Sequence, residues 1–228
     1  MEPLVLVPGL LCDDDAWSEQ AAALSADREV HVADVTAPES IVAMADAVLA
    51  QAPERFALAG CSMGGYVALA LMARAPERVT RLALVDTGAG EDTPEQRRRR
   101  AATVALARDE GIAAAAMALV PVVFAPAAAE ALTPRWLAMA QRLGTEVLAR
   151  QQDACAARPD RREELAAIAC PTLVLHGALD QLTPPPLSFE LAALIRGARL
   201  EAIDDCGHFA PWEQPATVTA ALTRWLAA

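Results

Sequence analysis

Short apolar runs without alternation recur along this chain and predict buried strands. Such runs cover residues 4–7, 56–59 and 172–175. A strand that is apolar at every position is typical of a parallel sheet covered by helices on both faces, because neither face meets water. Between the runs, apolar residues recur at helical spacing, as over residues 40–50, where Ser40 is a suitable N-cap. The pattern therefore predicts an α/β fold with a mostly parallel sheet.

The same pattern divides the chain into a core and an insertion. About six strands are expected, at residues 4–7, 29–34, 56–59, 79–85, 172–175 and 199–203. Residues 91–169 interrupt the alternation, because they are rich in Ala, Arg and Glu at helical spacing and carry no strand signal. We therefore expect residues 1–90 and 170–228 to form the core, and residues 91–169 to form an inserted helical cap.

The sequence G-C-S-M-G at residues 60–64 follows an apolar run and precedes a helical pattern. This arrangement is typical of a nucleophile elbow, a sharp strand-to-helix turn that presents a serine above a sheet. The backbone of that serine is strained, and Gly60 and Gly64 leave room because they have no side chains. Ser62 is therefore the predicted nucleophile. The backbone N–H of Met63, at a helix N-terminus, is a predicted donor to an oxyanion.

An acid and a base for this serine follow later strands. Asp180 comes after the apolar run at residues 172–175, and His208 follows the last expected strand. The carboxyl ends of parallel strands meet at one edge of a sheet, where ligands bind. A serine hydroxyl needs a neighbouring base, so we predict that His208 takes its proton and that Asp180 orients the imidazole. Asp86, at the end of another strand, is the alternative acid.

Together these motifs resemble the α/β-hydrolase superfamily in its compact bacterial form with a helical cap. The resemblance extends over nearly the whole chain through LVPGLL, GCSMGG, LALVDTG, LVLHGALD and GHFAPWEQP. The leading β-hairpin usual in the family is expected to be absent. The resemblance implies hydrolysis of a small-molecule carboxylic ester or related acyl bond through an acyl-enzyme, without a metal or organic cofactor. A serine at the elbow argues against the branches that carry an aspartate there, the haloalkane dehalogenases and epoxide hydrolases.

The resemblance also assigns further site residues. Matching the family's His-Gly-x turn to residues 8–10 assigns the second oxyanion donor to the backbone N–H of Leu10. Leu11 is the alternative donor, because Pro8 replaces the usual histidine. The expected substrate pocket consists of Leu11, Trp17, Phe124, Trp136 and Phe209.

Composition and charge exclude several other classes of protein. Apolar residues make up 54% and charged residues 21% of the 228 residues, which favours a compact globule over a disordered chain. A net charge of −11 argues against nucleic acid or an anionic membrane as a partner. The N-terminal segment lacks the basic start of a secretory signal, and the five cysteines form no C-x-x-C pair. We therefore expect a single cytoplasmic domain.

The sequence leaves the reaction within this class open. A carboxylic ester hydrolase is predicted, while a thioesterase, an enol-lactone hydrolase or a carbon-carbon bond hydrolase would use the same three residues. A cofactor-free perhydrolase and a non-catalytic ligand-binding hydrolase fold are further alternatives.

Four arginines at residues 97–100 stand out in an acidic chain. A solvated helix face paired with acids is the predicted role, and an anion-docking patch is the alternative.

Overall fold

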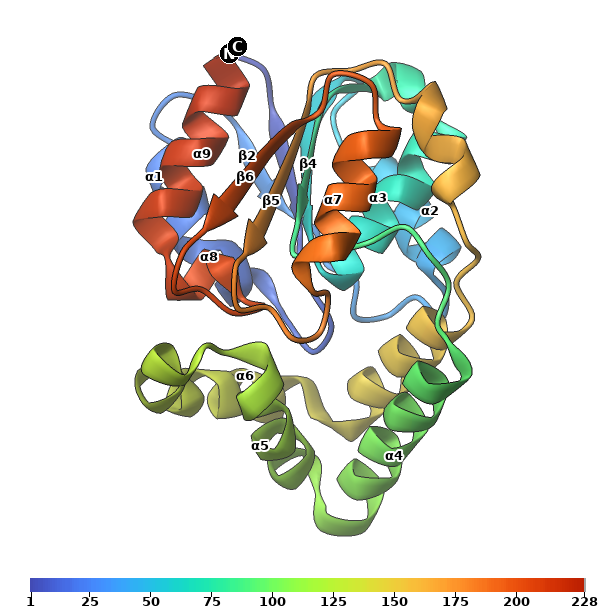
Figure 1. Cartoon of the computed structure of the whole chain (residues 1–228), viewed down its shortest axis with the longest axis vertical. Helices are drawn as coiled ribbons and strands as arrows, with labels where there is room; N and C mark the ends of the chain where they lie inside the picture. The colour runs from blue at the N-terminus through green and yellow to red at the C-terminus, as the bar shows by residue number, and fades with distance from the viewer. Residues whose placement is uncertain (228) are drawn as a thin grey trace.

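The computed structural model describes residues 1–227, and within them it contains one sheet of six strands (Figure 1). The strands are β1 (Leu4–Val7), β2 (Val30–Val32), β3 (Phe56–Cys61), β4 (Val79–Val85), β5 (Thr172–Gly177) and β6 (Arg199–Ile203). Neighbouring strands are all parallel, in the order β2-β1-β3-β4-β5-β6. The predicted parallel α/β sheet is therefore confirmed.

Helices cover both faces of this sheet. Helices α1 (Ser18–Leu24) and α9 (Pro215–Ala227) lie on one face, and α2 (Ile41–Gln51), α3 (Met63–Arg74) and α7 (Pro185–Leu194) lie on the other (Figure 1). Alternate side chains of each strand face opposite sides. In β1, for example, Leu4 and Leu6 pack into the core on the α1 side, while Val5 and Val7 pack into the core on the α3 side. Both faces of β1, β3 and β5 are buried, so these central strands are apolar at nearly every position. Residue Ala228, the last of the expected core range, lies outside the described residues.

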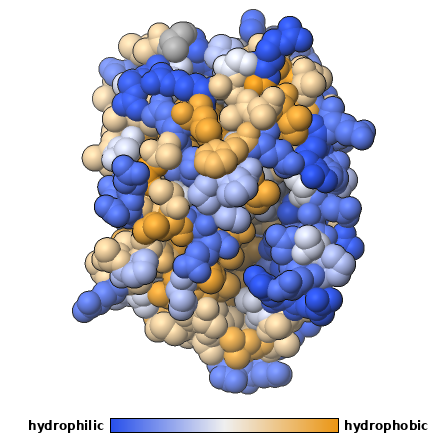
Figure 2. Space-filling view, viewed as in Figure 1, coloured by the Kyte–Doolittle hydropathy of each residue, from blue (hydrophilic) through white to orange (hydrophobic). Residues whose placement is uncertain are grey.

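The chain between β4 and β5 is helical. Its helices are α4 (Pro94–Glu110), α5 (Ile112–Val123), α6 (Pro126–Ala156) and the short η3 (Arg162–Ala167). Helix α6 consists of two helices joined at Gly144, whose φ of 82° breaks the regular conformation. Figure 1 shows α4, α5 and α6 beyond the carboxyl ends of the strands, and Figure 2 shows a hollow in the surface at that level. The division into a core and a cap stays a prediction.

No helix within residues 1–227 is both long enough and apolar enough to cross a bilayer.

An ion-pair cluster attaches α6 to the segment around the 3-10 turn η1 (Asp14–Trp17). The Arg135 guanidinium lies 2.5 Å from an Asp15 carboxylate oxygen and 2.7 Å from a Glu19 carboxylate oxygen. It also lies 4.2 Å from the centroid of the Trp212 ring. The hydrogen bond from Arg135 is the main reason why the pKa of Asp15 is lowered. Because Arg135 and Asp15 are 120 residues apart in sequence, the cluster fixes the insertion to the rest of the molecule.

Replacing Arg135 by glutamine should therefore lower the free energy of unfolding by about 1 to 2 kcal/mol at pH 7. Because the folded-state pKa of Asp15 is lowered, its contribution is present above the ordinary value of about 3.9 and is lost as the pH falls through the lowered value. The difference between wild type and variant should thus shrink as the pH is lowered below about 4, as measured by urea unfolding. Arg98→Gln, which removes an exposed arginine of α4, is the control. A difference that does not change with pH would contradict this assignment.

Candidate active site

Ser62 lies at the turn between β3 and α3 in a left-handed backbone conformation, with φ 54° and ψ −116°. A Cβ at position 60 would lie 2.2 Å from the carbonyl oxygen of Gly64. A Cβ at position 64 would lie 2.1 Å from the carbonyl oxygen of Val7 in β1. Both contacts are far too short for any side chain, so the turn requires glycine at Gly60 and Gly64. The Ser62 N–H donates to the Val85 carbonyl at 2.9 Å, which ties the turn to the end of β4.

The side chains of Ser62, His208 and Asp180 form one continuous hydrogen-bonded line. His208 Nε2 lies 2.7 Å from Ser62 Oγ, and His208 Nδ1 lies 2.8 Å from Asp180 Oδ2. The three residues follow β3, β6 and β5, so they come from loops that meet at the carboxyl edge of the sheet. The structure thus brings together the residues that the sequence suggests as nucleophile, base and acid.

Hydrogen bonds from the following loop hold the Asp180 carboxylate. The backbone N–H groups of Leu182 and Thr183 donate to Oδ1 at 2.8 and 3.0 Å, and the Thr183 hydroxyl donates to Oδ2 at 2.7 Å. Burial alone would raise the pKa of Asp180, but the His208 charge and these hydrogen bonds lower it. For His208, burial acts to lower the pKa, and the adjacent Asp180 carboxylate raises it above the ordinary value. Asp180 is thus a carboxylate at neutral pH, and it makes the imidazole a stronger base.

Asp86, the alternative acid, has a different set of contacts. Its Oδ1 accepts the Gly177 N–H at 2.8 Å, and its Oδ2 accepts the Ala210 N–H at 3.2 Å. Burial raises the pKa of Asp86 well above its ordinary value, and the nearby Asp180 charge raises it further. Asp86 therefore joins the end of β5 to the segment after His208, whose Nδ1 is bonded to Asp180.

Glu213 also fixes the position of the His208 segment. Its carboxylate accepts the backbone N–H groups of Gly207 at 2.9 Å and Phe209 at 3.0 Å, on either side of the histidine. The same carboxylate accepts the Ala125 N–H at 2.8 Å, at the start of α6. The histidine loop and the insertion are thus joined through one side chain. This role is not readable from the sequence, because a single glutamate after Phe-Ala-Pro-Trp carries no pattern that indicates which backbone groups it accepts.

The loop after β1 packs against the elbow. A Cβ on Gly9 would lie 3.5 Å from Ser62 Cβ, which is ordinary van der Waals contact. The Leu11 N–H, one candidate oxyanion donor, donates instead to Gln151 Oε1 of α6 at 2.7 Å. Gln151 is completely buried. Leu10 therefore stays the predicted second donor, beside Met63 at the N-terminus of α3.

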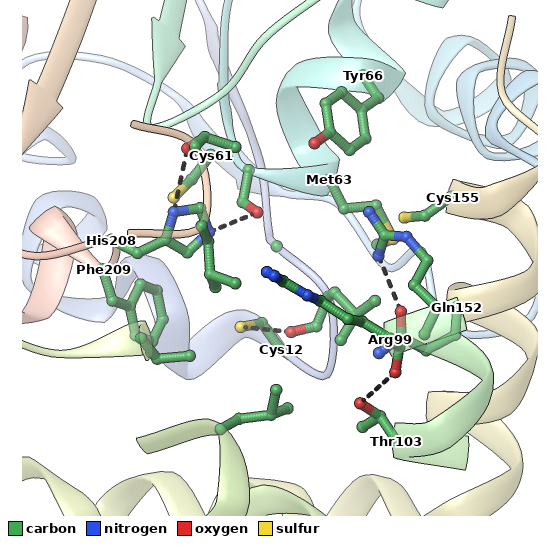
Figure 3. A pocket seen from close by; sticks show the side chains of 18 of the residues that line it. Cys12, Cys61, Met63, Tyr66, Arg99, Thr103, Gln152, Cys155, His208 and Phe209 are labelled. Carbon is green, nitrogen blue, oxygen red and sulfur yellow. Dashed lines mark hydrogen bonds between the residues drawn. The ribbon is translucent and has the colours of Figure 1, made fainter. Parts of the chain in front are cut away.

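A cavity of about 180 Å³ adjoins Ser62 and His208 (Figure 3). This volume is below the roughly 300 to 1,000 Å³ of drug-sized ligand pockets, so it suits a small substrate. The apolar part of its lining includes Met63, Leu119, Val123, Trp136 and Phe209. The polar part includes Gln96, Arg99, Arg100, Thr103 and Gln152.

The expectation that Leu11, Trp17 and Phe124 line the pocket is corrected: within the described residues, none of the three is part of the cavity lining. Leu11 and Trp17 are completely buried in the core, where Trp17 Nε1 donates to the Val7 carbonyl at 3.1 Å. Phe124 packs behind the lining, with its ring centroid 6.1 Å from that of Phe209. All three side chains belong to the buried core, and residue type alone does not specify whether an apolar side chain packs there or lines the cavity.

Comparison with known proteins indicates the same class of protein that the fold indicates. A sequence model of the alpha/beta hydrolase family matches residues 4–222. The chain belongs to the alpha/beta hydrolase family and is a hydrolytic enzyme.

Its relatives include esterases. The chain is 33% identical over 198 residues to a pimeloyl-[acyl-carrier protein] methyl ester esterase of Neisseria meningitidis, covering 82% of this chain and 75% of that protein. A thermophilic esterase from Thermogutta terrifontis has a TM-score of 0.90 and 30% identity, covering 100% of this chain and 90% of that one. The enol-lactonase from Burkholderia xenovorans LB400 has a TM-score of 0.85 and 30% identity, with coverages of 100% and 92%. The predicted enzyme class, a hydrolase of the esterase type, is confirmed by these relationships.

The elbow geometry predicts that Gly64→Ala removes activity. Its Cβ would overlap the Val7 carbonyl oxygen, so β1 or the turn must shift. A strain of about 2 to 4 kcal/mol should lower the melting temperature by several degrees. Turnover of p-nitrophenyl butyrate should fall at least about 100-fold, since misplacement near 1 Å costs that much. Gly90→Ala is the control, because its Cβ would lie 3.8 Å from the nearest atom of Arg162. A Gly64→Ala enzyme as stable and active as Gly90→Ala would disprove the constraint.

Proposed function

We propose that this protein hydrolyses carboxylic esters of small acyl groups through a serine acyl-enzyme. The observation that carries the proposal is the hydrogen-bonded line from Ser62 through His208 to Asp180, placed beside a cavity with an apolar wall. The esterases and the enol-lactonase among the relatives support cleavage of an ester or a lactone, which is an internal ester. A small-molecule ester is thus the proposed substrate, and a cytoplasmic location stays a prediction.

In the first half of the proposed reaction, Ser62 Oγ attacks the ester carbonyl carbon while His208 Nε2 takes the hydroxyl proton. Asp180 Oδ2 accepts a hydrogen bond from the Nδ1–H group of the imidazole and stays ionised, which fixes the tautomer and stabilises the imidazolium. The carbonyl oxygen becomes an oxyanion, and the N–H groups of Leu10 and Met63 donate to it. His208 then gives its proton to the ester oxygen, the carbon-oxygen bond breaks, and the alcohol leaves.

In the second half, a water molecule attacks the acyl carbon and transfers a proton to His208 Nε2. The same two N–H groups donate to the second oxyanion. When this intermediate collapses, the proton passes from His208 to Ser62 Oγ and the carboxylic acid is released. The raised pKa of His208 suits both transfers, because the ring must accept and then return a proton near neutral pH.

We also propose that α4, α5 and α6 act as a cap that sets substrate selectivity. Leu119, Val123 and Trp136 of the cavity lining come from α5 and α6, whereas Ser62, Asp180 and His208 come from loops of the sheet. The reacting groups thus come from the sheet region, whereas part of the binding wall comes from the inserted helices.

Ser62→Ala tests the nucleophile. The variant should lower kcat for p-nitrophenyl butyrate by roughly 10⁴ to 10⁶, because no other group in the line can attack the carbonyl. A fluorophosphonate probe should label the wild type and not the variant, as measured by mass spectrometry. Ser25→Ala, at an exposed position after α1, should be labelled and turn over as the wild type does. If Ser62→Ala kept full activity, the proposed mechanism would be rejected.

Exchange of the two aspartates for asparagine distinguishes their roles. Asp180→Asn should lower kcat by roughly 10⁴, because the amide cannot stabilise the imidazolium or keep the tautomer. Asp86→Asn should lower the melting temperature, since it disturbs the contacts with Gly177 and Ala210, and should change kcat by less than about tenfold. Steady-state kinetics and thermal unfolding measure both effects. The opposite ranking of kcat values would make Asp86 the acid.

A further inference from the structure

The lining of the catalytic cavity has the opposite charge bias to the rest of the chain. The chain has 30 acidic and 19 basic residues. Among the described residues that line the cavity, Arg99 and Arg100 carry charged side chains and no Asp or Glu occurs. A local positive potential in an acidic protein is expected to attract an anionic ligand. The arginine run is thus divided, because Arg97 and Arg98 are exposed outside this lining.

Arg100 belongs to a fixed, positively charged part of the wall. Its guanidinium lies 2.5 Å from an Asp92 carboxylate oxygen and donates to Gln152 Oε1 at 2.8 Å. The buried Arg158 also pairs with Asp92 and lies 4.0 Å from the centroid of the Tyr66 ring. One carboxylate therefore serves two guanidinium groups, which leaves a net positive charge at this end of the cavity.

Arg99 is the arginine that can exchange its partner. Figure 3 shows its side chain extending from α4 into the cavity. It lies 2.5 Å from Glu95 Oε1, one turn earlier, and the two side chains are 75% and 61% exposed. An ion pair this exposed contributes little stability, so a ligand carboxylate can replace Glu95. A guanidinium group can bind a carboxylate through two parallel hydrogen bonds.

The position of the base indicates which part of the substrate faces Arg99. His208 must give its proton to the ester oxygen of the leaving alcohol, so the alcohol lies on the His208 side. Figure 3 shows His208 and Phe209 on one side of the cavity, and Arg99 and Gln152 on the other. The acyl group therefore extends from Ser62 toward α4.

We propose that Arg99 is a specificity-determining residue that binds a carboxylate at the far end of the acyl group. Preferred substrates are then short monoesters of dicarboxylic acids rather than neutral alkyl esters. The inference rests on the proposed ester hydrolysis at Ser62, and the cavity of about 180 Å³ limits the acyl chain to a small size.

The test compares two esters of equal chain length, methyl hydrogen adipate and methyl hexanoate, by titration of released acid at pH 7.5. The measured quantity is the ratio of kcat/KM for the anionic ester to kcat/KM for the neutral ester. We expect a ratio above one for the wild type. For Arg99→Gln the ratio should be lower by about tenfold, because the variant loses one charged contact with the anionic ester. Added salt at 0.5 M should also lower the wild-type ratio, because it screens charges at an open site.

Arg98→Gln is the matched control, since it removes the same charge from the neighbouring exposed position of α4 and should leave the ratio unchanged. An equal effect of both variants would overturn the inference, because it would reflect net charge alone. The hexanoate ester of glycolic acid carries its carboxylate on the alcohol side, and an Arg99→Gln effect confined to that ester would also overturn it. Wild-type hydrolysis of methyl hexanoate without preference for the adipate refutes only this inference. Hydrolysis of neither ester refutes the proposed function as well.

Discussion

The close contact between the β3–α3 turn and the end of β1 is the constraint on which the site depends. With glycine at positions 60 and 64, the turn packs directly on its own helix and on the Val7 carbonyl. That contact holds Ser62 in a left-handed conformation and turns its hydroxyl out of the sheet. Because β1 and β3 are adjacent in the sheet, the loop at Gly9 lies against the serine as well. One tight turn thus places both the serine and its neighbouring N–H groups.

Three acidic side chains position the other parts of the site by accepting backbone N–H groups. Asp86 joins the end of β5 to the segment after His208, and Glu213 holds the residues on either side of that histidine. Asp180 receives its donors from its own loop. Backbone N–H groups that are shielded from water need hydrogen-bond partners. In these loops the acidic side chains accept hydrogen bonds from N–H groups that have no partner in a helix or strand. The distance between His208 and Ser62 therefore depends on several contacts that do not touch a substrate.

The insertion and the sheet contribute different properties. Groups that would carry out the reaction come from the loops that follow β3, β5 and β6. Helices α4, α5 and α6 contribute part of the cavity wall, and the Arg135 cluster, Gln151 and Glu213 join them to the sheet region. Side chains of these helices that line the cavity, such as Arg99 and Leu119, can therefore alter what it binds without supplying a reacting group. The arginines of α4 show this separation, because they give the cavity a charge that the acidic sheet region lacks.

The sequence by itself determined the order of strands and helices, since burial on both faces leaves an unbroken apolar run in each central strand. It also located Ser62, Asp180 and His208, because each follows such a run and parallel strands end at one edge. It left open whether Asp86 or Asp180 contacts His208, because both follow strands that reach this edge. The tertiary structure decided that contact, the engagement of the Leu11 N–H by Gln151 and the burial of Trp17 away from the cavity. These features depend on side-chain directions and on contacts between residues far apart in sequence, which no local pattern of residues specifies. Leu11 and Gln151, for example, are 140 residues apart.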